Sequence, residues 1–187
     1  MACDLTLGRL EPCKDSLGGI KALYFENFAA DDTITYDVTN TDEITDIQVA
    51  ATGAITVYKY DVKGDNSNLE QNINSSRDNG TTFFEQIINA TLKKLDVATH
   101  KELKLMAHGR TRVFVHTNNG DAFCVGVEFG AEVTGGTVVT GSALGDLSGY
   151  TIVLTAQEKT PANFLQGATA ADPFAGLTTA PTVVEGT

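Results

Sequence analysis

An Asn-Gly pair between two apolar runs constrains the fold more than any other part of this sequence. The stretch TRVFVHTNNGDAFCVGV begins at Thr111. Asn-Gly favours the tight turn of a β-hairpin, because both residues tolerate a positive φ. We therefore predict a two-residue turn at Asn119 and Gly120, with positive φ at both positions. It would join strands at Arg112–His116 and Ala122–Val127.

Other segments carry similar strand signals. They are short, rich in β-branched and aromatic residues, and several alternate apolar with polar side chains. The segments are Ile20–Phe25, Ile34–Val38, Ile44–Val49, Ala54–Val62 and Tyr150–Ala156. A chain of 187 residues is long enough for one well-buried core. The pattern predicts a single, mainly β domain.

One helix is expected after these β signals are set aside. Asp96 is a suitable N-cap for the segment VATHKELKLMAH, and Gly109 can end the helix in a left-handed conformation. Its modest apolar face would consist of Val97, Leu103, Met106 and Ala107. The helix makes the expected class mainly β with an α+β character.

Two segments are ambiguous. Phe83–Leu95 (FFEQIINATLKKL) matches a helical stripe and also alternates as a strand would, and the periodicity alone slightly favours a helix. Gly64–Thr81 is rich in Asn, Ser, Asp and Gly. It is either a long exposed loop or a hairpin arm with a weak strand around Leu69–Ile73.

The two ends of the chain differ in composition from the middle. Residues 1–19 mix Pro and Gly with single apolar residues, which predicts an extended arm before a β domain at residues 20–165. Residues 166–187 contain no Lys or Arg and are dominated by Ala, Thr, Gly and Pro. We expect this C-terminal extension to lack a core of its own and to be ordered by docking on a neighbour. The start of the sequence shows no secretory signal, and the longest apolar run is too short for a bilayer.

The residues that often carry chemistry do not form a recognisable site. Ser148 lies in GDLSG, which is not the G-x-S-x-G elbow of a hydrolase and has its serine one position later than Gly-Asp-Ser-Gly. The glycines from Gly135 to Gly149 lack the lysine of a phosphate loop. The histidines and cysteines, which lack metal-ligand spacing, are His100, His108, His116, Cys3, Cys13 and Cys124. We expect no enzyme activity, no cofactor and no metal, and we expect Cys124 to be a small buried apolar residue.

Charge is unevenly distributed along the chain. The net charge is -11, which disfavours sequence-specific binding of nucleic acid. Residues 22–58 hold seven acidic and no basic side chains, whereas residues 93–112 hold six basic and two acidic ones. These blocks are either ordinary solvated surface or opposite patches that meet between neighbouring copies of the chain.

The order of several segments resembles the major tail tube proteins of long-tailed bacteriophages, especially those of phages with Bacteroidetes-like hosts. The similar segments are SSRDNGTTFFEQ, a Lys- and Leu-rich stretch, TRVFVHTNNGDAFCVGVEFGAEVTGG and GDLSGYTIVLTAQEKTPANFL. The likeness covers roughly Tyr58–Leu165 in layout, and LGRLEPCKDSLGGI near the start is also similar. The extension after Gln166 matches no common core element of that family.

The resemblance implies a virion protein with no catalytic role. Such subunits are β-sandwiches with one flanking helix, and they assemble into hexameric rings that stack into a tube. Their strands join an inner β-barrel between subunits, so Phe83–Leu95 is expected to be a long strand leading into the helix. Implied partners are further copies of the chain, the tape measure, the tail terminator and, in a contractile tail, a sheath. DNA would pass through the lumen without specific binding, no membrane would be involved, and assembly would occur in the bacterial cytoplasm.

Exposed turns are the candidate assembly loops in this interpretation. Their residues are Asp78, Asn79, Gly80, Gly135, Gly136, Gly145, Asp146 and Gly149. Another virion part, such as a head-tail connector, tail terminator or capsid decoration protein, is the second hypothesis. The third is a non-catalytic β-sandwich module that binds a glycan or peptide.

The tube hypothesis also predicts the charge of the channel wall. A channel that conducts DNA must not attract the polyanion, and salt limits charge effects to about 8 Å, so only lumenal side chains matter. We expect more Asp and Glu than Lys and Arg on the inner wall. Since side chains alternate along a strand, at most one of Lys93 and Lys94 can point inward.

Overall fold

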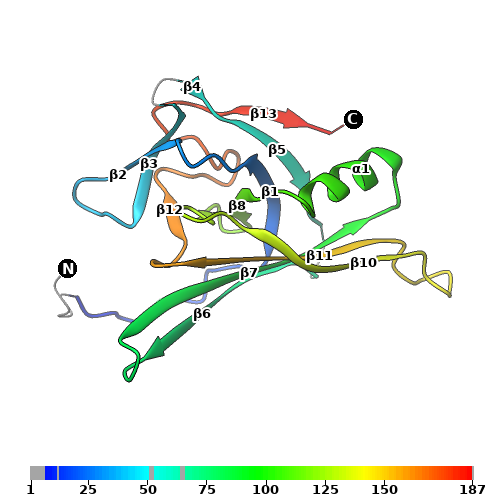
Figure 1. The fold of residues 1–187 in the computed structure, drawn as a ribbon, viewed down its shortest axis with the longest axis horizontal. Coiled ribbons are helices and arrows are strands. Elements are labelled where there is room, and N and C mark those ends of the chain that lie inside the picture. Colours follow the sequence, from blue (N-terminus) through cyan, green and yellow to red (C-terminus); the bar gives the residue numbers. More distant parts are fainter. Residues whose placement is uncertain (1–6, 12, 51–52, 64–65, 187) are drawn as a thin grey trace.

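Two central strands organise the structure, β1 (Ile20–Asn27) and β8 (Thr111–Thr117), which pair antiparallel. The computed structural model describes residues 7–11, 13–50, 53–63 and 66–186 (Figure 1). Both strands are buried along almost their whole length, which means that each of their faces is covered. Near-continuous apolar sequence is typical of such strands, and ALYF and VFV have it.

These two strands belong to a large sheet of nine strands. Its other members are β2 (Thr33–Tyr36), β3 (Glu43–Val49), β4 (Gly53–Ala54), β5 (Thr56–Asp61), β9 (Ala122–Val125), β12 (Asn163–Leu165) and β13 (Thr182–Glu185). The strand order is β13-β5-β1-β8-β9-β12-β3-β2, and β4 pairs with β3. All neighbours are antiparallel except β12 with β3 and β13 with β5.

A small sheet of four strands packs against one face of the large sheet. Its strands are β6 (Asn68–Ser76), β7 (Thr81–Lys93), β10 (Glu132–Val139) and β11 (Gly149–Glu158). They run in the order β10-β11-β7-β6, and every neighbouring pair is antiparallel. The single described helix, α1 (Val97–Met106), follows β7 and lies beside the end of both sheets (Figure 1). The expected mainly β sandwich with one helix is therefore confirmed.

Alternation along β1 and β8 gives the protein two apolar cores. Leu23 and Val113 point toward the small sheet and pack with Ile88 and Leu154 in the first core. Tyr24 and its neighbour on β8 point the other way, into a second core that β3 and the C-terminal segment complete. One pair of strands thus anchors both cores.

The C-terminal segment fills part of the second core, contrary to the expectation that it docks on a neighbour. Phe174 and Leu177 are buried there, and the ring of Phe174 contacts Tyr24 and Phe114 edge-on at 5.1 and 5.3 Å. After this segment, β13 pairs with β5. Backbone hydrogen bonds also hold the segment, from the amides of Gln166, Thr178 and Thr182 to the carbonyls of Ile44, Thr45 and Ile55.

Most of the expected strands are confirmed, with two differences. Phe83–Leu95 falls within β7 up to Lys93, as the family resemblance implied, and the weak strand around Leu69–Ile73 is β6. Ala54–Val62 is divided, since the chain changes pairing partner from β3 to β1 at Ile55. The strand β10 was missed because its sequence, EVTGGTVV, contains a Gly pair that indicates a loop.

The hairpin between β8 and β9 is present, but the predicted two-residue turn is wrong. Gly120 has a φ of 94°, whereas Asn119 is not among the non-glycine residues with positive φ. The Gly120 amide donates to the Thr117 carbonyl at 3.2 Å, and the Thr117 amide donates to Asp121 at 2.9 Å. This is the three-residue loop in which an ordinary turn precedes a left-handed glycine. The side chains of Asn118 and Asn119 instead hold the N-terminal arm, at Gly18 and Leu17.

Gly120 is also packed against the C-terminal segment, which generates a prediction. A Cβ at Gly120 would lie 2.7 Å from the Ala170 nitrogen, whereas Gly80, also at positive φ, has open space around it. Gly80→Ala should cost about 1–2 kcal/mol through backbone strain alone. Gly120→Ala should lower the free energy of unfolding by roughly 1–3 kcal/mol more, because backbone must also move. Equal losses for the two variants in urea denaturation would show that the contact with Ala170 is not made.

Candidate assembly surfaces

The face of the small sheet that points away from the large sheet is mostly polar, although Ile87 of β7 and Val153 of β11 also lie on it. Strand alternation places Asn89 and Thr91 of β7 on it, together with Thr151 and Thr155 of β11. The hydroxyl groups of Thr134 and Thr155 lie 2.9 Å apart, and those of Thr137 and Thr151 lie 2.6 Å apart. The Asn89 amide donates to Asn68 at 3.1 Å. This face is suited to contact with water rather than with another apolar layer.

Both edges of the small sheet are open among the described residues. Strand β6 pairs only with β7, and β10 pairs only with β11. The outer side of each therefore presents backbone N–H and C=O groups without a strand partner in the described part of the chain. Long open edges are pairing sites for another chain.

The turn of the β6–β7 hairpin holds the first group of candidate assembly residues. Asp78, Asn79 and Gly80 are exposed at its tip, and the Gly80 amide donates to the Arg77 carbonyl at 3.3 Å. The hairpin projects from one end of the molecule, and the β10–β11 connection extends at the opposite end (Figure 1). These residues are placed where a neighbouring copy could reach them.

The loop between β10 and β11 is closed by its own aspartate. The Asp146 carboxylate accepts from the backbone amides of Ala143 at 2.7 Å and Ser142 at 2.9 Å, and these bonds lower its pKa. Gly145 in this loop has no other atom within 4 Å of where a Cβ would be, and Leu144 beside it is fully exposed. The aspartate thus shapes an exposed loop.

Of the three remaining candidate glycines, one has space for a side chain and two do not. Gly135 lies at a register shift of β10 and has space for a side chain. A Cβ on Gly136 would lie 2.6 Å from the Thr151 carbonyl oxygen, and one on Gly149 would overlap the Leu92 carbonyl. Gly136 and Gly149 are therefore needed for close approach of strands inside the small sheet rather than for contacts with a neighbour.

Helix α1 is capped at its start as expected, but its end differs. The Asp96 carboxylate accepts from the Thr99 amide at 3.0 Å, which lowers the Asp96 pKa. The helix ends at Met106 with Ala107 as C-cap, and Gly109 is not left-handed, although its amide donates to Leu105 at 3.1 Å. Of the expected apolar face, Met106 is buried and Leu103 half-buried, whereas Val97 and Ala107 are exposed.

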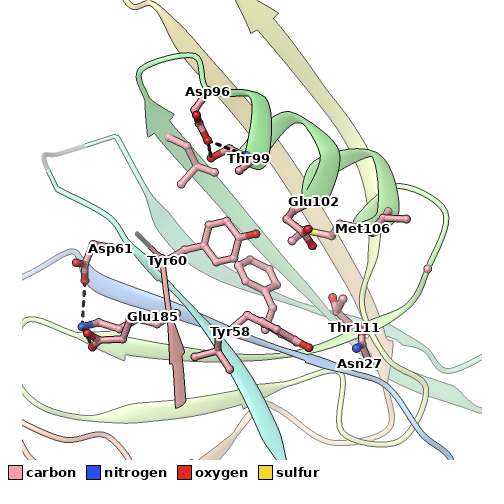
Figure 2. A pocket seen from close by; sticks show the side chains of 18 of the residues that line it. Asn27, Tyr58, Tyr60, Asp61, Asp96, Thr99, Glu102, Met106, Thr111 and Glu185 are labelled. Carbon is pink, nitrogen blue, oxygen red and sulfur yellow. Dashed lines mark hydrogen bonds and ion pairs between the residues drawn. The ribbon is translucent and has the colours of Figure 1, made fainter. Parts of the chain in front are cut away.

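A groove of about 850 Å³ separates α1 from strands β5 and β13. In Figure 2, Tyr60 points from β5 toward the helix, and Glu102 and Met106 face it from α1. The Tyr60 ring contacts Phe25 edge-on at 5.0 Å, and burial raises its pKa. At the far side, Glu185 pairs with Lys59 at 2.7 Å. The floor of the groove is therefore aromatic, and its rim is charged.

A buried ion cluster lies on the other side of the large sheet's centre. The guanidinium of Arg112 contacts Glu26 at 2.8 Å and Asp32 at 3.0 Å, and the Phe28 ring lies 5.3 Å from its central carbon. All three charged side chains are almost completely buried. Two carboxylates share one guanidinium, and burial raises the pKa of Glu26 to about 7. The cluster fastens the β1–β2 connection to β8.

The other residues with chemical potential also serve the fold. Cys124 is buried, and burial raises the pKa of its thiol far above the ordinary value, as expected of an inert core residue. The ring of His116 contacts the Thr169 carbonyl at 2.9 Å, and burial lowers its pKa. The Ser148 carbonyl accepts from the Lys94 amide at 2.7 Å. Cys13 is a free thiol on the exposed arm, and Cys3 lies outside the described residues.

The described residues contain no cluster of three or more His, Cys, Asp or Glu side chains able to hold a metal ion. In the same ranges, no helix has the length and apolarity needed to cross a membrane. Comparison of the chain with protein-family models, curated proteins and solved structures finds no match.

The ion cluster predicts how stability depends on pH. The pKa of Glu26 in the folded protein is raised from 4.5 to about 7. The protonated Glu26 therefore contributes fully to the free energy of unfolding below pH 4.5, and this contribution is lost as pH rises through 7. The free energy of unfolding should fall by about 3 kcal/mol over this range, at 1.36 kcal/mol per pKa unit. Glu26→Gln keeps an acceptor for Arg112 and should remove this slope, so that the variant overtakes the parent above pH 7. Urea denaturation from pH 5 to 8 measures it, with exposed Glu11→Gln as control, and parallel curves for parent and variant would contradict it.

The small sheet generates a second prediction, on its glycines. Gly149→Ala should lower the free energy of unfolding by roughly 1–3 kcal/mol, because β11 must move away from the Leu92 carbonyl. Gly145→Ala, four residues earlier in open space, should change it by less than about 0.5 kcal/mol. Thermal and urea unfolding of both variants measure the difference. A stable Gly149→Ala protein would mean that the two strands are further apart than described.

Proposed function

We propose that the chain is the repeating subunit of a phage tail tube, a structural virion protein that forms stacked hexameric rings around a DNA channel. The observation that carries this proposal is the small sheet, whose edge strands β6 and β10 have no outer partner in the described part of the chain and whose outer face is mostly polar. A sheet of this kind is completed most simply by further copies of itself.

Strand direction supports closure into a ring. The four strands of the small sheet alternate in direction, so β6 and β10 at its two edges run oppositely. Rotation about a ring axis places β6 of one copy beside β10 of the next, and the new pair is again antiparallel. Every junction between copies is then the same, and no edge of the small sheet remains exposed.

The size of the resulting barrel fits passage of DNA. Six copies of a four-stranded sheet make a barrel of 24 strands. At ~4.8 Å between strands and a tilt of about 40°, its wall would be about 50 Å across at the backbone. Barrels of 16–18 strands already enclose a water-filled channel. The channel would therefore accept a duplex.

The charge of the polar face also supports the proposal. Alternation places Glu70, Glu85 and Glu132 on this face against one base, Lys93. Lys94 has left the strand, with a φ of 72°. A wall with three acids and one base per subunit would repel DNA weakly, as free passage requires.

The alternatives differ in the assembly they form. A tail terminator or connector would form single rings, and a capsid decoration protein would not stack. A β-sandwich module for a glycan or peptide would remain dispersed, and the open edges of the small sheet would then have no role.

Electron microscopy of the purified chain tests the proposal. We expect hollow tubes, or rings near six times the 19.8 kDa mass of the chain, with light scattering giving the mass of the smallest ring. Rings that never stack would favour a terminator or connector. Dispersed monomers at high protein concentration would overturn the proposal.

A further inference from the structure

We propose that neighbouring copies bind each other through Ile73, whose side chain projects from β6 of one copy and enters the groove between α1 and β10 of the next. The inference rests on the proposed function, since it describes how copies of the small sheet would join. It names the residue and the pocket at that junction.

Ile73 is a large apolar side chain in an unusual position. It is 70% exposed, although it lies on the same side of β6 as Leu69, which packs against the first core. Its partner on β7 is Phe84, near the projecting end of the hairpin. The apolar side of β6 therefore continues beyond the part of the sandwich that covers it.

A matching groove of about 310 Å³ lies at the opposite edge of the same sheet. Leu103 of α1 and the C-cap Ala107 form one wall, and Val133 and Val138 of β10 form the other. Val138 is 57% exposed, so the groove opens toward the free edge of β10. Its lining is mostly apolar and suits an aliphatic side chain.

The symmetry of a ring brings the two features together. Rotation about the ring axis keeps the same face of every small sheet inward. The helix-bearing side of β10 and the Ile73 side of β6 therefore both face outward at the junction. Because strands of a barrel are staggered along one another, β6 can slide along β10 until Ile73 reaches the groove.

Charge favours the same pairing. Residues 66–86, which include β6 and its turn, hold three acids and one base: Glu70, Asp78, Glu85 and Arg77. Residues 93–104, which include α1, hold four bases and two acids: Lys93, Lys94, Lys101, Lys104, Asp96 and Glu102. Lys104 lines the groove itself, so its positive charge attracts the acidic β6 edge with Glu70 and Asp78.

Substitution of Ile73 tests the contact. Because the side chain is exposed in the single chain, Ile73→Asp should leave the melting temperature of the unassembled protein unchanged. It should raise the protein concentration needed for tubes or rings at least tenfold. Val138→Asp, in the groove, should have the same effect on assembly. Val38→Asp is the matched control, since Val38 is 96% exposed on the β2–β3 connection of the large sheet.

Cross-linking locates the contact directly. With Cys3 and Cys13 changed to serine, the pair Ile73→Cys and Val138→Cys should give a ladder of covalent oligomers with a short bis-maleimide. Within one chain, β6 and β10 are three strand spacings apart, about 14 Å, so a short linker joins different copies. Ile73→Cys with Val38→Cys should give no ladder.

The outcomes separate this inference from the proposed function. Tubes from the parent chain with normal assembly of Ile73→Asp would overturn the Ile73 contact and leave the tube proposal standing. Tubes without the cross-linked ladder would do the same. A parent chain that forms neither rings nor tubes would overturn both.

Discussion

Burial of β1 and β8 on both faces is the constraint on which the rest of the structure depends. Alternate side chains of these strands enter two different cores, so the small sheet and the C-terminal segment are held by the same pair. A polar side chain at the centre of either strand would face an apolar layer on whichever side it pointed. Arg112 and His116 are buried polar residues of β8, and each has polar partners: Arg112 pairs with Glu26 and Asp32, and His116 contacts the Thr169 carbonyl. The buried ion cluster is thus a consequence of this two-sided burial.

The same constraint leaves the small sheet free on its other face. Because most of its apolar side chains are used against the large sheet, its outer face carries mainly threonines, asparagines and a few charges, with Ile87 and Val153 among them. The division is visible in β7, where Ile88 and Leu92 point inward and Asn89 and Thr91 outward. A water-facing sheet with open edges follows from the way the core is built, and the proposed tube makes use of it.

Local signals in the sequence predicted the elements whose stability is local. The hairpin at Asn119–Gly120 and the cap at Asp96 were located correctly, because turn and cap chemistry depend on adjacent residues. The turn type was wrong because the loop also has to contact Leu17 and Ala170, which lie far away in sequence. Strand β10 was hidden by its Gly136, which β11 requires at close approach. The ion pair between Arg112 and Glu26 spans 86 positions and leaves no local pattern. The groove beside β10 likewise exists only when α1 and the small sheet meet, so the sequence could suggest exposed loops but not this groove.

The turn between β8 and β9 contacts both the N-terminal arm and the C-terminal segment. Asn119 binds the N-terminal arm at Leu17, while Gly120 touches the C-terminal segment at Ala170. The N-terminal arm and the C-terminal segment are therefore coupled through a loop of three residues. Because the same C-terminal segment carries Phe174 into the second core, a displacement of the arm at Leu17 would act through this loop on the packing of that core.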